Sequence, residues 1–193
     1  KDGDVVYIPS GNNTWSSHVR LDKAIAIIGA GSGGATQTVI NGFGFAVADG
    51  TDNWRISGIR FVGAGATAID GSEVLMTVSS GHSTNGCRNF RIDNCVIVKA
   101  YRGIWVYGHS TGVIDHNTFR DIDVGCVYVW GDNSASWNRE LTWGSSDFVF
   151  IEDNLFRTTF EPSAHAVSGG HGGRYVFPYN KIDDDFNNSD WDW

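Results

Sequence analysis

The chain has 193 residues, of which 41% are hydrophobic and 19% charged, so it is too apolar for a disordered chain and its length suits one domain. The formal net charge is −8, from 14 basic and 22 acidic residues, and this excludes nucleic acid as the expected partner because phosphate binding needs a basic surface. The longest apolar runs, such as 24–28, are far too short to span a membrane.

Short β-branched runs closed by glycines fill the N-terminal part of the chain. They are GDVVYIPSG (3–11), AIAIIGAG (24–31) and TVINGFGFAVADG (38–50). Runs of this kind are typical of short strands joined by turns. No amphipathic helix of about 10 residues or more is apparent, which favours an all-β fold.

Five later segments align without gaps and indicate an internal repeat. They are WRISGIRF (54–61), FRIDNCVI (90–97), GVIDHNTF (112–119), VFIEDNLF (149–156) and YVFPYNKI (175–182). The first and third positions alternate as the inward side chains of a strand do. The third and eighth positions predict two stacked internal columns, namely Ile56, Ile92, Ile114, Ile151 and Phe177, and Phe61, Ile97, Phe119, Phe156 and Ile182.

The sixth position of the repeat is mostly asparagine. It holds Ile59, Cys95, Asn117, Asn154 and Asn180. Stacked Asn side chains hydrogen-bond one another and the turn backbone, which satisfies groups that a buried turn would leave unpaired. We therefore expect a ladder of buried amides at one turn of a solenoid.

A second strand follows each later repeat, at 103–108 (GIWVYG), 126–131 (CVYVWG) and 165–170 (HAVSGG), and the region 67–71 (TAIDG) is assigned to the same place earlier. Coils of about 22 to 26 residues fit the short intervals, with insertions such as 132–146 in the long ones. The prediction is an all-β solenoid of roughly seven to eight coils over residues 1–184, with 185–193 as a polar, aromatic tail or truncated end. A β-sandwich is the alternative fold, but it would not produce an aligned Asn column.

The glycine-closed openings and the repeated I-x-x-N-x-F resemble the right-handed parallel β-helix repeat of the pectin-lyase-like superfamily. That superfamily includes polysaccharide lyases, glycoside hydrolases, epimerases, phage tailspikes and adhesins, so the resemblance implies the fold and leaves the activity open. The pectate-lyase-like motifs are not matched. Gly170-His171-Gly172 matches only the last piece of the N-T-D, D-D, G-H-G set of glycoside hydrolases, so no catalytic role is transferred.

Aligning the second strands on their closing glycines, Gly71, Gly108, Gly131 and Gly170, predicts a polar column at the solenoid edge. The residues that follow them are Ser72, His109, Asp132 and His171. Neighbouring coils lie about 4.8 Å apart, so His109, Asp132 and His171 would be adjacent and could form an acid–base set or a metal site. The alternative is a set of solvated turn residues.

Three carboxylates occupy the fourth position of consecutive repeats: Asp93, Asp115 and Glu152. Stacked carboxylates repel one another, and Ca²⁺ would relieve the repulsion because it takes several oxygen ligands. One carboxylate could instead have a raised pKa and serve as an acid, or the column could be ordinary turn chemistry. Apart from this calcium candidate no cofactor is expected, because the cysteines lack the C-x-x-C spacing of a transition-metal site.

The outward residues of the second strands predict an aromatic patch. If the alternating Ile and Val residues face inward, Trp105, Tyr107, Tyr128 and Trp130 face outward on two adjacent coils. Flat aromatic faces suit the C–H faces of sugars, although a loop could cover the patch instead. The arginines at 102, 139 and 174 could complement an acidic polysaccharide, because guanidinium groups bind carboxylates in a bidentate manner.

Two classes of function follow. One is a secreted, extracellular protein that binds a polysaccharide or glycan or cleaves it, as a lyase or a glycoside hydrolase. The other is a non-catalytic shaft, adhesin stalk or filament subunit that associates with itself through open coil ends. The three cysteines, Cys87, Cys95 and Cys126, allow at most one internal disulfide and do not decide the compartment.

Overall fold

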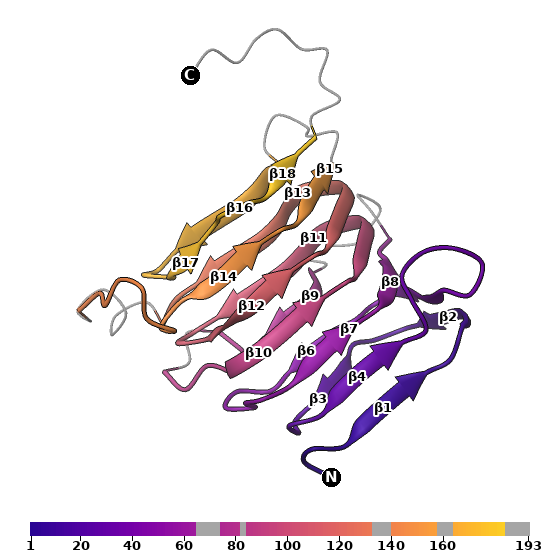
Figure 1. The fold of residues 1–193 in the computed structure, drawn as a ribbon, viewed down its shortest axis with the longest axis horizontal. Helices are drawn as coiled ribbons and strands as arrows, with labels where there is room; N and C mark the ends of the chain where they lie inside the picture. The colour runs from indigo at the N-terminus through magenta and orange to yellow at the C-terminus, as the bar shows by residue number, and fades with distance from the viewer. Residues whose placement is uncertain (65–73, 82–83, 133–139, 158–163, 184–193) are drawn as a thin grey trace, which may run out of the picture.

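The computed structural model describes residues 1–64, 74–81, 84–132, 140–157 and 164–183. Every regular element in these ranges is a β-strand, and all the strand pairs run parallel. The strands stack from the N-terminal coil to the C-terminal coil as successive turns of one solenoid (Figure 1). The prediction of an all-β parallel solenoid is therefore confirmed.

One strand from each of seven coils forms the front sheet, which faces the viewer in Figure 1. Its strands in spatial order are β1 (Val5–Ile8), β4 (Ala26–Gly29), β7 (Arg55–Ser57), β10 (Arg88–Asp93), β12 (Thr111–Asp115), β14 (Val149–Glu152) and β17 (Tyr175–Val176).

The second sheet is bent into two limbs, because the long strands β11 (Val96–Tyr107) and β13 (Thr118–Trp130) pair with different strands along their length. Lys99 and Asp121 have φ of 54° on these two strands, which turns the chain. The first limb also contains β2 (Gly11–Trp15), β5 (Thr38–Gly42), β8 (Ile59–Val62), β15 (Leu155–Arg157) and β18 (Lys181–Ile182). The second limb also contains β3 (Val19–Leu21), β6 (Phe45–Val47), β9 (Val74–Val78) and β16 (His165–Gly170).

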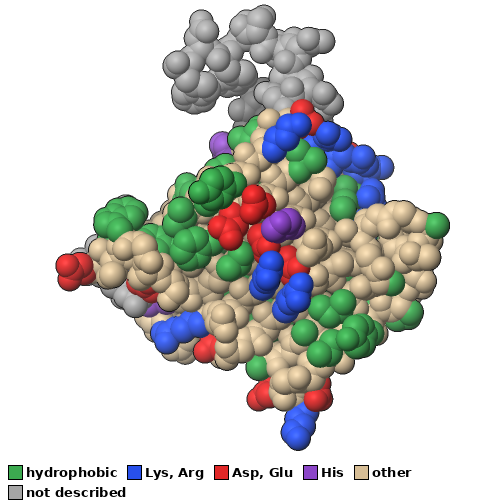
Figure 2. Space-filling model, viewed as in Figure 1, with side chains coloured by type: hydrophobic (Ala, Val, Ile, Leu, Met, Phe, Trp, Pro, Cys, Tyr) green, Lys and Arg blue, Asp and Glu red, His purple; other side chains and the backbone are tan. Residues whose placement is uncertain are grey.

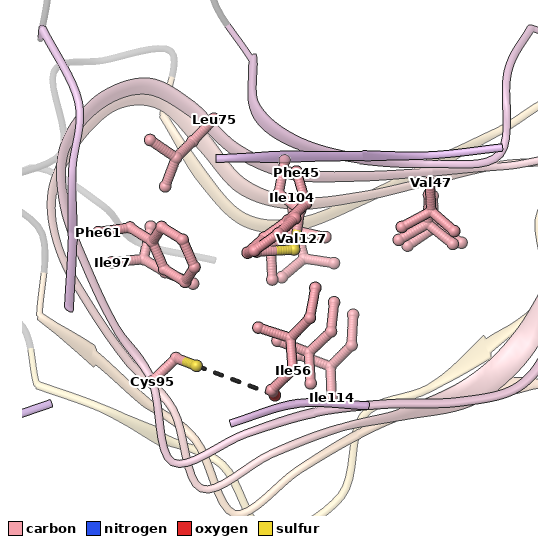
Figure 3. Packing of buried hydrophobic residues seen from close by; sticks show 14 of the residues in the cluster. Phe45, Val47, Ile56, Phe61, Leu75, Cys95, Ile97, Ile104, Ile114 and Val127 are labelled. Carbon is pink, nitrogen blue, oxygen red and sulfur yellow. Dashed lines mark hydrogen bonds between the residues drawn. The ribbon is translucent and has the colours of Figure 1, made fainter. Parts of the chain in front are cut away.

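The core includes the two predicted columns and the inward side chains of the second limb. Ile92 lies opposite Ile56 on one side and Ile114 on the other, and Ile114 lies opposite Ile151. Figure 3 shows Ile56 and Ile114 from this column, with Phe61 and Ile97 from the other column across the interior. These side chains have no accessible surface, so the alternation read from the sequence is confirmed as the packing pattern of the solenoid.

The second column is likewise continuous from Phe61 to the last coil. The rings of Phe119 and Phe156 stack in parallel with their centroids 4.9 Å apart. Ile182 follows Phe156 in register, and it is half-exposed because no described strand lies beyond it. Aromatic stacking between coils adds to the burial of apolar area in holding the coils together.

The turn between the front sheet and the first limb repeats one backbone conformation. The residue at the fifth position of every repeat has φ between 53° and 69°: Gly58, Asn94, His116, Asp153 and Tyr179. This left-handed residue bends the chain sharply from the front sheet into the first limb, and the next side chain points inward. That next side chain is the sixth position of the repeat.

The predicted amide ladder occupies this turn. Asn117 and Asn154 are buried, and the side-chain oxygen of Asn154 accepts hydrogen bonds from both the backbone N–H and the side-chain amide of Asn117, at 2.9 and 3.1 Å. Asn180 does the same for Asn154, at 2.9 and 3.0 Å. The amide of Asn154 also donates to the carbonyl of Ile114 at 2.8 Å. The ladder therefore satisfies buried backbone groups of three consecutive turns.

Two other residues extend this column toward the N-terminus. Cys95 takes the asparagine position, and its sulfur lies 4.0 Å from the carbonyl of Ile56 (Figure 3), while its N–H donates to the oxygen of Asn117 at 2.9 Å. Thr38, in register with Ile59, accepts from the N–H of Ala30 and contacts the carbonyl of Ile8. The hydroxyl thus replaces the amide in the first coils.

All three cysteines are buried free thiols. Burial raises the pKa of Cys87 to about 11 and that of Cys95 to about 12, and it also raises the pKa of Cys126. They are therefore protonated and unreactive at neutral pH, and they act as small apolar residues.

One strand assignment was wrong. The second strand of the third coil is β9, at Val74–Val78, where Met76 pairs with Ile104, whereas the sequence placed it at 67–71. The region 67–71 lies outside the described residues, as do residues 133–139 of the insertion and the expected tail 185–193.

Candidate functional site

The outer face of the second limb carries the predicted aromatic residues. Ile104, Val106, Val127 and Val129 face the core, so the alternating residues of β11 and β13 point outward. The ring of Trp105 is 5.2 Å from Tyr107, 5.2 Å from Tyr128 and 5.9 Å from Trp130, measured between centroids. The four rings therefore form one contiguous cluster, which we call the aromatic patch.

The aromatic patch is more buried than the sequence indicated. Trp105, Tyr107 and Trp130 are half-buried, but Tyr128 is only 8% exposed. The reason is Gly125, where a Cβ would lie 2.5 Å from the Tyr128 ring, so the missing side chain lets the ring lie down on the strand. Tyr128 thus supports the patch from below, and the other three rings present its surface.

Arg102 borders the aromatic patch. Its guanidinium lies 4.7 Å from the centroid of Tyr101 and 5.3 Å from that of Trp105, both within the range of a cation–π contact. Burial raises the pKa of Tyr107 and of Tyr128, and Arg102 opposes this shift in both. Both phenols therefore remain hydrogen-bond donors at neutral pH.

His109 and Asp132 come together at the edge of the second limb, as predicted. Because Tyr107 pairs with Trp130, the residues two positions further on are also adjacent, and Nε2 of His109 lies 2.6 Å from Oδ2 of Asp132. The Asp132 side chain is fully buried, whereas the His109 side chain is 16% exposed. A buried carboxylate therefore holds an imidazole that still reaches the surface.

His171 does not continue this column, which corrects the predicted alignment. Trp130 pairs with Gly170, so His171 falls opposite Gly131, one position before Asp132. Its ring instead lies on Trp130, at 4.6 Å between centroids. His171 therefore belongs to the border of the aromatic patch. Of the earlier members of the predicted column, Gly71 and Ser72 lie outside the described residues.

A small pocket lies beside the His109–Asp132 pair. It is lined by Gly108, His109, Ser110, Thr111, Asp147, Gly172 and Arg174. Nη1 of Arg174 lies 3.0 Å from Oδ2 of Asp147, and the Arg174 side chain is largely buried. The pocket therefore combines an imidazole, a guanidinium and a carboxylate.

The front sheet carries the three carboxylates considered for calcium, and they do stack as predicted. Asp93 pairs with Asp115, and Asp115 pairs with Glu152. Arginines neutralise the first two: Arg55 binds Asp93 with contacts of 2.7 and 2.6 Å, and Arg91 binds Asp115 with contacts of 2.9 and 2.6 Å. Figure 2 shows basic and acidic side chains gathered side by side on this face.

These ion pairs leave the calcium hypothesis without support. Each bidentate guanidinium occupies the carboxylate oxygens that a cation would need. Among the described residues, no group of three or more His, Cys, Asp or Glu side chains is placed to hold a metal ion. The column is a ladder of ion pairs that joins neighbouring coils.

The ion-pair ladder lacks one arginine, which gives a testable prediction. The pairs run from the second position of one repeat to the fourth position of the next, and the residue that would reach Glu152 is Val113. Val113→Arg is expected to raise the free energy of unfolding by about 0.5 to 1 kcal/mol, which is a rise of a few degrees in Tm for a chain of this size. Thermal melts of the variant measure the gain.

The control is the double variant Val113→Arg with Glu152→Gln, which should show no gain. Salt should reduce the gain of the single variant, because ions screen half-exposed charges. A gain that survives in the double variant would show that the new arginine acts through packing alone.

Sequence reasoning missed two features of the site. The arginine partners were visible in the repeat, because Arg55 and Arg91 share its second position on the face that carries the carboxylates. Asp147 was not visible, since it lies in a segment with no periodicity. The register of His171 had a signal in Val167, which pairs with Val127; aligning these inward valines, rather than the glycines, places it correctly.

No helix in the described part of the chain is long and apolar enough to cross a membrane. A comparison with curated proteins finds no match. The family model described as "right handed beta helix region" matches residues 10–140, more than half of the 193 residues. Together with the parallel register and the amide ladder, this match shows that the chain belongs to the right-handed β-helix family.

Proposed function

We propose that this β-helix is a secreted, pectin-lyase-like protein that binds a polysaccharide or glycan on its second limb. The observation that carries the proposal is the aromatic patch, where Trp105, Tyr107 and Trp130 present ring surface on adjacent coils. Aromatic rings with polar tips suit sugars, which offer both C–H faces and hydroxyl groups. Arg102 and His171 add hydrogen-bonding groups at the border of the patch.

The pocket beside the patch is suited to acid–base chemistry on a bound sugar chain. Asp132 would orient the His109 ring through Nε2, which leaves Nδ1 as the nitrogen that exchanges a proton with the ligand. The Arg174 guanidinium would stabilise negative charge that develops on an oxygen nearby. Cleavage by elimination and cleavage by hydrolysis both need such a proton transfer, so the proposal covers a lyase or a glycoside hydrolase.

A second candidate function is a structural one, favoured by a different observation. The outermost strand, β1, is paired on one side only, and Val5, Val6 and Tyr7 are between 45% and 76% exposed. A free strand edge with apolar side chains invites association with another strand. Sedimentation velocity over a range of protein concentrations tests this candidate, which requires assembly that a Val6→Lys variant prevents.

Paired substitutions separate binding from turnover. Trp105→Ala with Trp130→Ala should abolish the retardation of the protein in native gels that contain a soluble polysaccharide, because the stacking surface is removed. His109→Ala should leave the retardation in place and lower the rate of product formation by about 100-fold or more, since general acid–base groups contribute 10²–10⁴-fold. Assays for new reducing ends and for unsaturated products measure that rate.

The matched control is Tyr7→Ala, because Tyr7 is an exposed aromatic residue on β1, outside the proposed site. Retardation of the wild type by none of a panel of neutral and acidic polysaccharides would overturn the binding proposal. If the wild type is retarded but forms no product, and His109→Ala is retarded equally, the protein binds the polysaccharide without cleaving it.

A further inference from the structure

The segment between β13 and β14 carries an exposed tryptophan that the proposed site has not used. The side chain of Trp143 is 77% exposed. Among the described aromatic residues, only Tyr7 and Tyr179 are exposed to a similar extent. The described part of this segment, residues 140–148, extends beyond the edge of the sheets (orange in Figure 1). An indole offers a large flat apolar face together with a polar N–H, which is the combination that a ligand with both apolar faces and polar groups can use.

The backbone fixes the position of Trp143. The N–H of Ser145 donates to the carbonyl of Thr142 at 3.2 Å, and Gly144 has φ of 80°. A positive φ at the third residue is the signature of a type II turn, which places Trp143 at its second residue. The N–H of Asp147 then donates to the Ser145 hydroxyl at 3.2 Å, which closes the segment on itself.

A buried neighbour fixes the orientation of the ring. Trp143 stacks on Phe148 with 5.8 Å between centroids and 22° between planes, and Phe148 is buried. One face of the indole thus rests on the protein and the opposite face is open. This is the arrangement of a flat platform with a defined direction, not of a side chain that turns freely.

Arg174 ties the platform to the His109 pocket. Its guanidinium bonds the carbonyl of Glu140 at 3.3 Å and the carboxylate of Asp147 at 3.0 Å, so both ends of the segment are held by a residue that lines the pocket. Gly172 also lines the pocket, and it follows His171, whose ring lies on Trp130. Residues of the pocket are therefore joined to both aromatic surfaces, through Arg174 to the segment of Trp143 and through Gly172 to the border of the aromatic patch.

We propose that Trp143 is a second sugar-stacking surface, so that a bound glycan passes from the aromatic patch over the His109 pocket and onto Trp143. This inference rests on the proposed function and adds the course of the ligand, which crosses the edge of the solenoid. A protein partner fits less well, because a stable interface needs about 800 Å² per partner and the apolar surface here is one ring beside Leu141. The neighbouring side chains, Thr142, Ser145 and Asp147, are polar groups that sugar hydroxyls can pair with.

The length of the ligand tests this course. The probes are hydroxyethyl cellulose and polygalacturonate, each cast in native gels, and then oligosaccharides of increasing length made from whichever polymer retards the wild type. Trp143→Ala should weaken binding of the long oligosaccharides by about 10-fold, because one stacking contact is lost. Short oligosaccharides that fill only the aromatic patch should bind wild type and variant equally.

Two variants in the same segment serve as controls. Trp143→Phe keeps a flat ring and should recover most of the affinity for long oligosaccharides, whereas Leu141→Ala should have no effect. Equal binding of every length by wild type and Trp143→Ala would overturn the inference while leaving the proposed function intact. Failure of both polymers to retard the wild type would overturn both, and loss of self-association in Trp143→Ala would assign the ring to a protein contact instead.

Discussion

Replacing Asn154 with leucine is expected to lower the free energy of unfolding by about 2 to 6 kcal/mol, because it leaves two buried backbone groups unpaired at about 1 to 3 kcal/mol each. The two groups are the N–H of Asn117, which loses its acceptor, and the carbonyl of Ile114, which loses its donor. Leucine has nearly the shape of asparagine, so packing changes little and the lost hydrogen bonds dominate. Urea denaturation followed by circular dichroism measures the loss.

A sharper form of this prediction compares the loss of stability at different positions of the asparagine ladder. Asn180→Leu should cost less than Asn154→Leu, because Asn180 makes the same hydrogen bonds to the preceding turn but is only partly buried, so water can reach the groups it leaves unpaired. Asn13→Leu, on the exposed strand β2, should change the stability by less than about 0.5 kcal/mol. Equal losses at the three positions would mean that the buried amides do not act as a ladder.

The sequence predicts the interior of this fold well because the interior follows one rule. Each repeat places side chains of the same kind at the same position, and a parallel register then brings Ile92 onto Ile56 and Phe156 onto Phe119. A shift of one residue would expose a whole apolar face, so the alternation strongly determines the register. The asparagine column follows from the same alignment.

The edge of the solenoid follows no such rule, and the predictions failed there. The strand β16 ends at Gly170 itself, whereas β13 ends at Trp130, one residue before its closing glycine, so aligning the glycines placed His171 one residue too far. Turn segments have no period, and the contact of Arg174 with Asp147 joins two of them across 27 residues. His109 and Asp132 were placed correctly because they follow two strands of equal register.

The carboxylate column shows that a correct placement does not by itself give the chemistry of a group of residues. Asp93 and Asp115 are stacked, as predicted, but stacked carboxylates need a calcium ion only where no protein cation is near. Arg55 and Arg91 hold the second position of the repeat, two residues before the position of the carboxylates. Residues i and i+2 of a strand lie on the same face of the sheet, so the arginines and the carboxylates share the outer face. Considering both positions together would have predicted ion pairs.

Asp93 is the member of this ladder whose side chain is fully buried, so its charge depends most on its partners. Burial alone would raise its pKa, but hydrogen bonds from Arg55, Asn94 and Ser57 outweigh that effect, and its pKa lies below the usual value of 3.8. The pKa of Arg55 is raised in turn, chiefly by its hydrogen bond with Asp93. Because the folded protein holds the Asp93 proton less tightly than the unfolded chain does, the pair stabilises the fold above about pH 4. That contribution disappears as the pH falls through the lowered pKa.

Arg55→Met is therefore expected to lower the free energy of unfolding by about 3 kcal/mol at neutral pH, since it leaves a buried carboxylate without its main partner. The loss is at the lower end of the range for buried pairs because Arg91 still lies 3.8 Å from Asp93. As the pH falls through the lowered pKa of Asp93, this carboxyl becomes protonated in the wild type as well as in the variant, and the two stabilities should converge. Urea titrations between about pH 7 and pH 3 measure this, with Arg20→Met as the control, because Arg20 and Asp22 form an exposed pair at 4.0 Å. A difference between wild type and Arg55→Met that stays constant over this pH range would show that Arg55 stabilises the coil by packing its aliphatic stem, and that the charge on Asp93 is held by other groups.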